Sequence, residues 1–455
     1  MYTLAKEMIG MKFKFKLGDF FLLTGTIIAF VLSIVLWIFI MTDDQHFNHI
    51  DQPNNATQEQ AHTHRTKSVY DLYIPTNSYG FNKGKLCRLY DSKNNLSLAF
   101  TKELKNIKFK SIKKVSSNQK QYEKLLNDPN FIQLAYPDEV TFHLFTKISM
   151  KKGNREFRRI FISSSDKWLY VANDKNSSIY RVKLEKANFS LLRHYAKNAK
   201  VKIPIKFVRL KNDYTVFYPK PVRWRVYSYL TDAQSDSYFV SRLLGTSNVA
   251  TRTSKDGRTT HSLNYYTKLQ VPKSGNNNNH NFLYTHYEKV KSPTATSRLL
   301  DSVYYVHRLG LNEQNLRFFD ADRNTVSYSN YIEGIPVFLN KQDLQADTTF
   351  STDSVVLAFN SLNLQIPIPF DGQTKTLQST DDVVKSLEKK GLKQSEIQRI
   401  TVSFKVEKDN SHEGLVNLIP TYYIKAYDQW KNLAEWEKQD FSTSSNFGQQ
   451  NEGVN

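Results

Sequence analysis

A short segment rich in glycine and lysine comes close to the pattern of a phosphate-binding loop. The segment from Gly80 to Lys85 reads GFNKGK, with one residue too few between its glycines and no hydroxyl residue after the lysine. In a P-loop, backbone N–H groups hold the phosphates and that hydroxyl group binds Mg²⁺. Because both the spacing and the metal-binding hydroxyl are missing, nucleotide binding is not predicted.

Serine and lysine recur at the spacing that penicillin-binding enzymes use for their nucleophile. Those enzymes also carry Ser-Asp-Asn and Lys-Thr-Gly motifs, and neither motif occurs in this sequence. Gly-x-Ser-x-Gly, His-Glu-x-x-His and EF-hand patterns are absent as well. A chain rich in serine and lysine produces such pairs by chance, so no enzymatic activity is predicted. The pairs are Ser111/Lys114, Ser164/Lys167 and Ser386/Lys389.

Candidate metal ligands are few. Four histidines stand in the polar segment 42–66, where no carboxylate or thiol lies at the spacing of a structural zinc site. The single cysteine, Cys87, excludes an intrachain disulfide, and its neighbours Leu86 and Arg88 favour a packed thiol over a nucleophile. We therefore predict no metal site and no cofactor. The four histidines are His46, His49, His62 and His64.

The charge of the chain is strongly positive. Lys and Arg total 63 against 43 Asp and Glu, which gives a net charge of +20. Such a charge attracts nucleic acids, membrane surfaces and anionic wall polymers. The location of the chain therefore has to decide between these partners.

A long apolar segment predicts a membrane anchor. Residues Phe20 to Met41 carry no charge, and about 20 apolar residues suffice to cross the hydrocarbon core of a bilayer. A secretory signal peptide has a shorter apolar region and small residues at its cleavage site, which this segment lacks. The sequence therefore predicts an uncleaved single-pass transmembrane helix over 20–41.

Charges flanking this helix predict its orientation. Lys12, Lys14 and Lys16 precede it, whereas Asp43 and Asp44 follow it, and positively charged flanks stay in the cytoplasm. The N-terminus is then cytoplasmic and the bulk of the chain extracytoplasmic, which excludes nucleic acid as a partner.

One face of the predicted helix carries small residues at every fourth position. Residues at this spacing share a helix face, and small side chains let a second helix approach closely. We interpret this face as a partner-helix interface, although small residues are also common in membrane helices without a partner. The predicted interface consists of Gly25, Ala29 and Ser33, and the predicted membrane-interface anchors are Lys12, Lys14, Lys16 and Trp37.

Hydrophobic periodicity and turn residues predict an α+β fold, with three extracytoplasmic α+β domains after the helix. A strand over Phe131–Tyr136 is expected to stop at Pro137, and Lys255–Arg258 is expected to turn between strands 246–252 and 259–271. The predicted divisions are 1–19 (cytoplasmic), 20–41 (transmembrane), 42–66 (flexible stalk), 67–203, 204–338 and 339–438 (N-terminal, central and C-terminal domains) and 439–455 (disordered tail).

An internal repeat links the last two predicted domains. Gly310 and Gly391 each follow a predicted helix, and each is expected to end that helix in a left-handed conformation. Strands follow in both copies, with Ile335-Pro336 in the first and Ile419-Pro420 in the second. Two copies of helix, strand, strand favour a duplicated α+β domain over a solenoid, which needs at least three repeats.

Several segments, taken in order, resemble the YycH family of low-GC Gram-positive bacteria. After the anchor that contains Trp37, the likeness covers about 20 to 435. The lead of 19 residues before the anchor departs from the family pattern and favours Met11 as an alternative start. The segments are 131–147 (FIQLAYPDEVTFHLFTK), 243–271 (LLGTSNVATRTSKDGRTTHSLNYYTKLQV), 328–338 (YSNYIEGIPVF) and 415–430 (LVNLIPTYYIKAYDQW).

This resemblance implies both a fold and a function. It implies three extracytoplasmic α+β domains, of which the last two are alike. It also implies a membrane complex with the sensor histidine kinase WalK (YycG) and with the related single-pass protein YycI, in which the chain sets kinase activity and thereby cell-wall homeostasis. An extracytoplasmic binding module for an anionic wall polymer or lipid is the alternative, and a wall-modifying hydrolase is disfavoured by the missing motifs.

Overall fold

The computed structural model describes most of the chain after residue 68. The chain separates into two units, 1–54 and 55–455, and the second unit contains every helix and strand discussed below. The described residues are 69–146, 156–211, 213–273, 280–289, 294–311, 315–339, 343–368 and 372–439, together with Thr26, Phe30, Ser33 and Phe441.

The predicted cytoplasmic segment 1–19 and stalk 42–66 lie outside the described residues, as do almost all of the anchor 20–41 and of the tail 439–455. Over the residues that are described, no helix has the length and apolar character that crossing a membrane requires.

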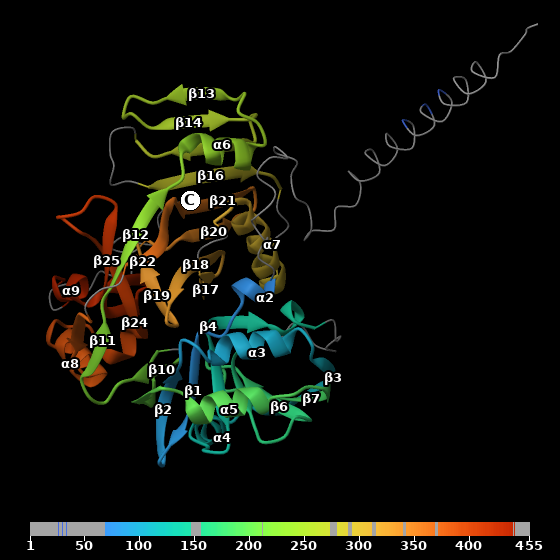
Figure 1. Cartoon of the computed structure of the whole chain (residues 1–455), viewed down its shortest axis with the longest axis vertical. Coiled ribbons are helices and arrows are strands. Elements are labelled where there is room, and N and C mark those ends of the chain that lie inside the picture. The colour runs from blue at the N-terminus through green and yellow to red at the C-terminus, as the bar shows by residue number, and fades with distance from the viewer. Residues whose placement is uncertain are drawn as a thin grey trace, which may run out of the picture. The chain divides into compact units, whose positions relative to one another are not determined.

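The N-terminal sheet is antiparallel and carries helices on its faces. Figure 1 shows α3 and α5 side by side against this sheet, where Phe100 of α3 stacks on Phe189 at the start of α5 with ring centroids 6.5 Å apart. The Asn95 side chain accepts a hydrogen bond from the N–H of Leu98 and so starts α3. The described strands follow in the order β3 (Lys108–Ser116), β7 (Ile179–Lys186), β6 (Trp168–Ala172), β5 (Glu156–Ile162), β4 (Ile132–Thr141), β1 (Asn77–Asn82), β2 (Lys85–Tyr90) and β8 (Val201–Pro204). The helices are α2 (Val69–Leu72), α3 (Leu96–Leu104), α4 (Gln119–Leu126), η1 (Phe142–Leu144) and α5 (Ser190–Asn198).

A second, longer sheet holds most of the remaining strands. Its path is β13 (Ala250–Thr253), β14 (Thr259–Ser262), β15 (Thr267–Val271), β16 (Asn281–Tyr287), β21 (Ser354–Asn360), β20 (Ala346–Phe350), β18 (Thr325–Ile332), β19 (Ile335–Phe338), β24 (Ile397–Lys408), β25 (Leu415–Ala426), β12 (Tyr227–Ala233) and β22 (Leu362–Ile368). Off this path, β17 (Leu316–Ala321) pairs with β18, and β26 (Gln429–Asn432) pairs with β25.

Short helices and two small strand pairs complete the described structure. The helices pack beside the long sheet, as Figure 1 shows for α6 near β16 and for α7 near β18 and β20. They are α6 (Asp236–Leu244), α7 (Ala295–Arg308), α8 (Thr380–Lys389), η2 (Gln394–Glu396) and α9 (Leu433–Glu437). The small pairs are β9 (Lys206–Arg209) with β10 (Tyr214–Phe217), and β11 (Val222–Arg225) with β23 (Thr374–Leu377).

Residues of both sheets share a hydrophobic core. Tyr73, directly after α2, is fully buried and donates a hydrogen bond to the carbonyl of Leu299 in α7 at 2.7 Å. Its hydroxyl also lies 2.9 Å from that of Tyr328 in β18. Burial of a large aromatic ring contributes on the order of 2–3 kcal/mol, so these contacts hold the start of the N-terminal sheet against the long sheet.

One parallel strand pair keeps the long sheet continuous across residue 338. Val337 of β19 pairs with Phe404 of β24, and the ring of Phe338 stacks on Tyr423 with centroids 3.7 Å apart. Beyond 338, β20 and β21 pair with β18 and β16. The division into domains 204–338 and 339–438 stays a prediction, and any such division has to cut through this sheet.

The predicted repeat agrees with the structure at its two glycines but not at its two prolines. Gly310 and Gly391 follow α7 and α8 with φ of +67° and +94°, which confirms their left-handed conformation. Pro336, however, lies in the third strand after its helix, whereas Pro420 lies in the second. The two prolines therefore do not occupy equivalent strands, and the repeat itself stays a prediction.

Two strand predictions are wrong. Strand β4 continues past Pro137 to Thr141, because the ladder to β5 shifts register between Ala135 and Val140, where a missing proline N–H is tolerated. The single strand predicted over 259–271 is the antiparallel pair β14 and β15, because the Asn264 side chain accepts hydrogen bonds from two backbone N–H groups and closes a turn. The predicted turn before β14 is confirmed.

Candidate functional site

A buried charge network lies where the N-terminal sheet meets the long sheet. Its members are charged, mostly enclosed and drawn from five different strands and two turns. Charged side chains are rarely buried unless they are paired, so this concentration sets the region apart. The network consists of Arg158, Arg159, Arg399, Lys425, Asp138, Asp174, Asp213 and Asp320.

Irregular strand geometry positions three of these side chains. Asp138 follows Pro137 inside the register shift of β4, Asp320 stands at a register shift between β17 and β18, and Arg399 stands at one between β24 and β25. An extra residue in a ladder redirects the side chains around it. The three irregularities thus turn charged groups toward a common point instead of leaving them on a regular sheet face.

Arg399 is the centre of the network. All five of its N–H donors have acceptors: two go to Asp213 at 2.6 and 3.1 Å, one to Asp138 at 2.8 Å, one to Asp320 at 3.2 Å and one to the carbonyl of Pro137 at 3.0 Å. Burial alone would lower the pKa of Arg399, but the three carboxylates outweigh burial and raise it above its ordinary value. The guanidinium therefore stays charged.

Asp174 pairs with the other two arginines of the network, Arg158 and Arg159. Arg159 binds it with two parallel hydrogen bonds of 2.8 and 3.0 Å, Arg158 adds one of 3.1 Å, and the Tyr122 hydroxyl donates another. Burial acts to raise the pKa of Asp174, but the two guanidinium groups outweigh burial and lower it. Arg158 also lies 3.5 Å from Asp213, which connects this half of the network to Arg399.

Asp320 accepts hydrogen bonds from three groups. Lys425 donates to it at 2.6 Å and the Trp430 indole N–H at 2.9 Å, in addition to Arg399. Burial raises the pKa of Asp320, helped by the negative charge of Asp138, whereas burial of Asp138 is outweighed by Arg399 and its pKa falls. Asp320 is therefore the more readily protonated of this carboxylate pair.

Glu139 is a buried titratable group at the edge of the network. It lies 2.8 Å from the Lys175 ammonium and is 7% exposed. Burial raises the pKa of Glu139 to about 7, while Lys175 acts in the opposite direction. This carboxyl therefore changes charge near neutral pH.

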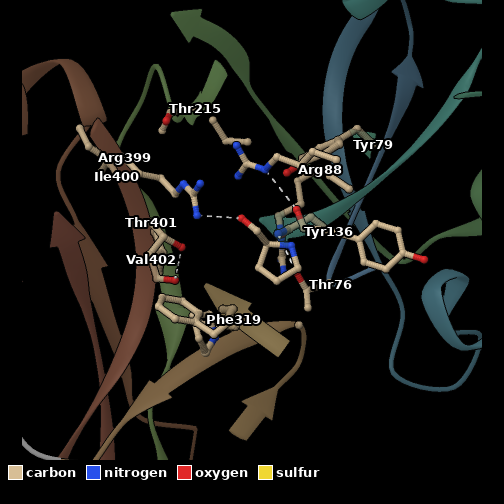
Figure 2. Close-up of a pocket in the computed structure, with 18 of the residues that line it drawn as sticks. Thr76, Tyr79, Arg88, Tyr136, Thr215, Phe319, Arg399, Ile400, Thr401 and Val402 are labelled. Atoms are coloured by element: carbon tan, nitrogen blue, oxygen red, sulfur yellow. Dashed lines mark hydrogen bonds between the residues drawn. The ribbon is translucent and has the colours of Figure 1, made fainter. Parts of the chain in front are cut away.

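A small cavity of about 70 Å³ opens beside Arg399. Figure 2 shows Arg399, Thr401 and Val402 of β24 on one side of it and Tyr79 and Arg88 of the N-terminal sheet on the other. Space of this size exceeds the roughly 10–15 Å³ that one water molecule needs on the same measure. The cavity is thus a chamber for a few waters or one small ligand, between strands that are far apart in the sequence.

The arrangement favours structure and binding over catalysis. The carboxylates of the network are held by guanidinium, ammonium or indole donors, as in a structural ion-pair network. No group of three or more His, Cys, Asp and Glu that could hold a metal ion occurs among the residues described.

Among the residues that the structure describes, none of those singled out from the sequence belongs to the charge network. Cys87 is packed in β2 at 2% exposure, and burial raises its pKa, as a packed thiol requires. Ser386 donates its hydroxyl hydrogen bond to Glu437. Ser33 is helical and exposed, whereas the other predicted interface and anchor residues lie outside the described residues, so that site stays a prediction. Those residues are Gly25, Ala29, Lys12, Lys14, Lys16 and Trp37.

Sequence reasoning missed the charge network, although a signal was present. Arg158-Arg159 and Asp320 stand beside buried apolar residues of their strands, in the segments FRRIFI and FFDA. A charge inside a buried strand needs a partner, but the partners of Arg399 stand 79, 186 and 261 residues away.

Comparison with known proteins decides the family. Residues 20–200 match the family described as YycH protein, N-terminal domain, and residues 215–440 match YycH protein, C-terminal domain. The chain belongs to the YycH family. YycH proteins are membrane-associated regulators of the WalK (YycG) two-component system that associate with its sensor kinase, and no enzymatic activity is known for the family.

A solved YycH structure has the same fold. The crystal structure of YycH from Bacillus subtilis superposes with a TM-score of 0.65 at 14% sequence identity, covering 81% of this chain and 98% of that one. No curated protein matches the chain. The mixed α+β architecture predicted from the sequence is confirmed, and among the described residues strands outnumber helices.

Replacing Arg399 is expected to lower the stability of the folded part of this YycH chain, in which the network joins both sheets. Arg399→Met leaves three buried carboxylates without their shared partner, and removing one side of a buried ion pair costs about 3–5 kcal/mol. Denaturant unfolding of the full chain measures this loss. Lys405→Met, which breaks an exposed pair with Glu407 in the same strand, is expected to cost at most about 1 kcal/mol. Equal losses in the two variants would contradict a special role for Arg399.

Glu139 is expected to make stability depend on pH. Its pKa is higher in the folded state, about 7, than its unfolded value of 4.5, so the folded chain binds the extra proton between these values. Stability from this group is then complete below about pH 4.5 and is lost as pH rises to 7, by roughly 3 kcal/mol. Unfolding measured at pH 5, 6 and 7.5 should show a shallower fall for Glu139→Gln than for the unchanged chain. The exposed Glu156→Gln serves as control, and parallel curves for all three would refute the assignment.

Proposed function

We propose that the chain is a membrane-anchored regulatory subunit that modulates a WalK-type sensor kinase together with a YycI-like partner. The observation that carries this proposal is the match of both YycH domains, in order, over residues 20–200 and 215–440. The match begins at the first residue of the predicted transmembrane segment, in keeping with an anchor that belongs to the functional unit.

Contact between helices in the membrane is the proposed route to the kinase. The face formed by Gly25, Ala29 and Ser33 allows close approach of a partner helix. A bound regulator changes the balance between active and inactive kinase only through a difference in its affinity for the two states. The outer part supplies such a difference when it contacts the kinase or a YycI-like chain as a stiff body, which the Arg399 contacts favour.

Binding of an anionic wall polymer to the outer surface is the second candidate function. The net charge of +20 favours it, because exposed lysines and arginines attract a polyanion in a salt-dependent way. This activity is compatible with kinase regulation, since the outer part would then act as the sensor.

Bulky residues on the small-residue face are expected to weaken kinase binding. In the full chain, Gly25→Leu with Ala29→Leu should reduce the kinase recovered by co-purification in mild detergent about tenfold, since close helix packing contributes about 1–2 kcal/mol. Kinase autophosphorylation, measured in membrane vesicles that contain the same double variant, should change together with kinase recovery. Ile27→Phe with Val31→Phe places bulky side chains on another face of the helix and is expected to leave both readouts unchanged. Kinase recovery that stays the same in both double variants would rule out the helix route.

A further inference from the structure

Among the described residues that line the cavity beside Arg399, every Lys, Arg, Asp or Glu is an arginine, so the charged groups are all positive. The described residues that line it include four arginines, Arg88, Arg158, Arg159 and Arg399, but no aspartate, glutamate or lysine. The carboxylates of the charge network stand behind this wall, where they hold Arg399, Arg158 and Arg159. The space itself is therefore faced by positive groups.

Arg88 brings a charge that the network does not neutralise. It is 4% exposed, and its Nη2 donates to the carbonyl of Glu333 at 2.9 Å. Its guanidinium carbon lies 5.6 Å from the ring centres of both Tyr90 and Trp224. Within the described part of the chain, it forms no ion pair with a carboxylate, unlike Arg399 with its three. A buried charge without a counterion is costly.

Two further donors at the cavity lack hydrogen-bond acceptors. Nη1 of Arg159, which is 1% exposed, and Oγ1 of Thr215 in β10, which is 2% exposed, have no partner among the described atoms. Both residues line the cavity, and Figure 2 shows Thr215 near Arg399. Buried donors of this kind are seldom left unpaired in folded proteins.

The electrostatics of Tyr79 show that the arginines converge. Tyr79 lines the cavity and is 3% exposed. Burial raises the pKa of its phenol, while Arg159, Arg158 and Arg88 all act to lower it, against a smaller opposing effect of Asp174. Three guanidinium groups thus act together on one point of the wall.

We propose that this cavity binds one small oxyanion, of the class of inorganic phosphate. Water would satisfy the hydrogen bonds of Thr215 and Arg159 but not the charge of Arg88, whereas an oxyanion satisfies both. Guanidinium and hydroxyl groups are the donors that proteins use for such anions. The volume of about 70 Å³ admits an inorganic ion and excludes a nucleotide or a polymer.

Such an anion would tie together strands from both sheets. Arg88 belongs to β2, Arg159 to β5 and Thr215 to β10, and Arg399 beside them belongs to β24. The bound anion would stabilise the packed arrangement over any arrangement in which these strands separate. The proposal concerns the second unit alone and does not depend on the kinase or on the membrane helix.

Equilibrium dialysis of the full chain with radiolabelled inorganic phosphate tests the proposal. The protein is kept in a nonionic detergent, and ionic strength is held constant with sodium gluconate, whose anion is too large for the cavity. One phosphate per chain is expected to bind saturably. Thr215→Val should weaken this binding about tenfold, because it removes a hydrogen bond to a charged group, and Arg88→Met should abolish it.

A matched variant separates this effect from a general loss of packing. Thr348 in β20 is also buried with an unpartnered Oγ1, but it does not line the cavity, so Thr348→Val should leave phosphate binding unchanged. Thermal unfolding adds a second readout: phosphate should raise the midpoint of the unchanged chain and of Thr348→Val more than that of Thr215→Val. The absence of saturable binding, or equal binding by the unchanged chain and Thr215→Val, would overturn the proposal.

Discussion

The five hydrogen bonds of Arg399 are the interaction on which the second unit, 55–455, depends. They join strand β24 to the bulge of β4, to the turn between β9 and β10 and to the end of β17. These segments come from different parts of the chain and belong to both sheets. Because every donor of the guanidinium has an acceptor, a shift in the register of β24 would move the buried group away from these acceptors.

Buried charges of this kind are a specific rather than a strong form of stabilisation. Desolvation offsets much of the attraction between the partners, and apolar residues of similar size often give equal stability. The hydrophobic contacts of Tyr73 and Phe338 supply packing between the sheets, whereas the charge network selects one geometry for it. A defined geometry suits a regulator, since a body that keeps its shape always presents the same surface.

Local patterns predicted much of the fold but little of the site. Hydrophobic periodicity predicted the strand over Phe131–Tyr136, and Gly310 and Gly391 marked helix ends, because these features depend on neighbours in sequence. The extension of β4 past Pro137 was missed because only its partner strand shows that the ladder is interrupted there. The network was missed for the same reason, as Asp138 and Arg399 meet only after both sheets have folded. The family, in contrast, was recognisable from the sequence, because several segments resemble it in the same order along the chain.

Hydrogen exchange under increasing denaturant tests most directly whether both sheets form one cooperative body. The measurement follows backbone amides of β4 and β5 and those of β24 and β25 in the unchanged full chain. Our account predicts that the slowest amides of both regions exchange through a shared opening, with the same free energy and the same dependence on denaturant. Opening of β4 and β5 at clearly lower free energy, while β24 and β25 remain protected, would contradict it.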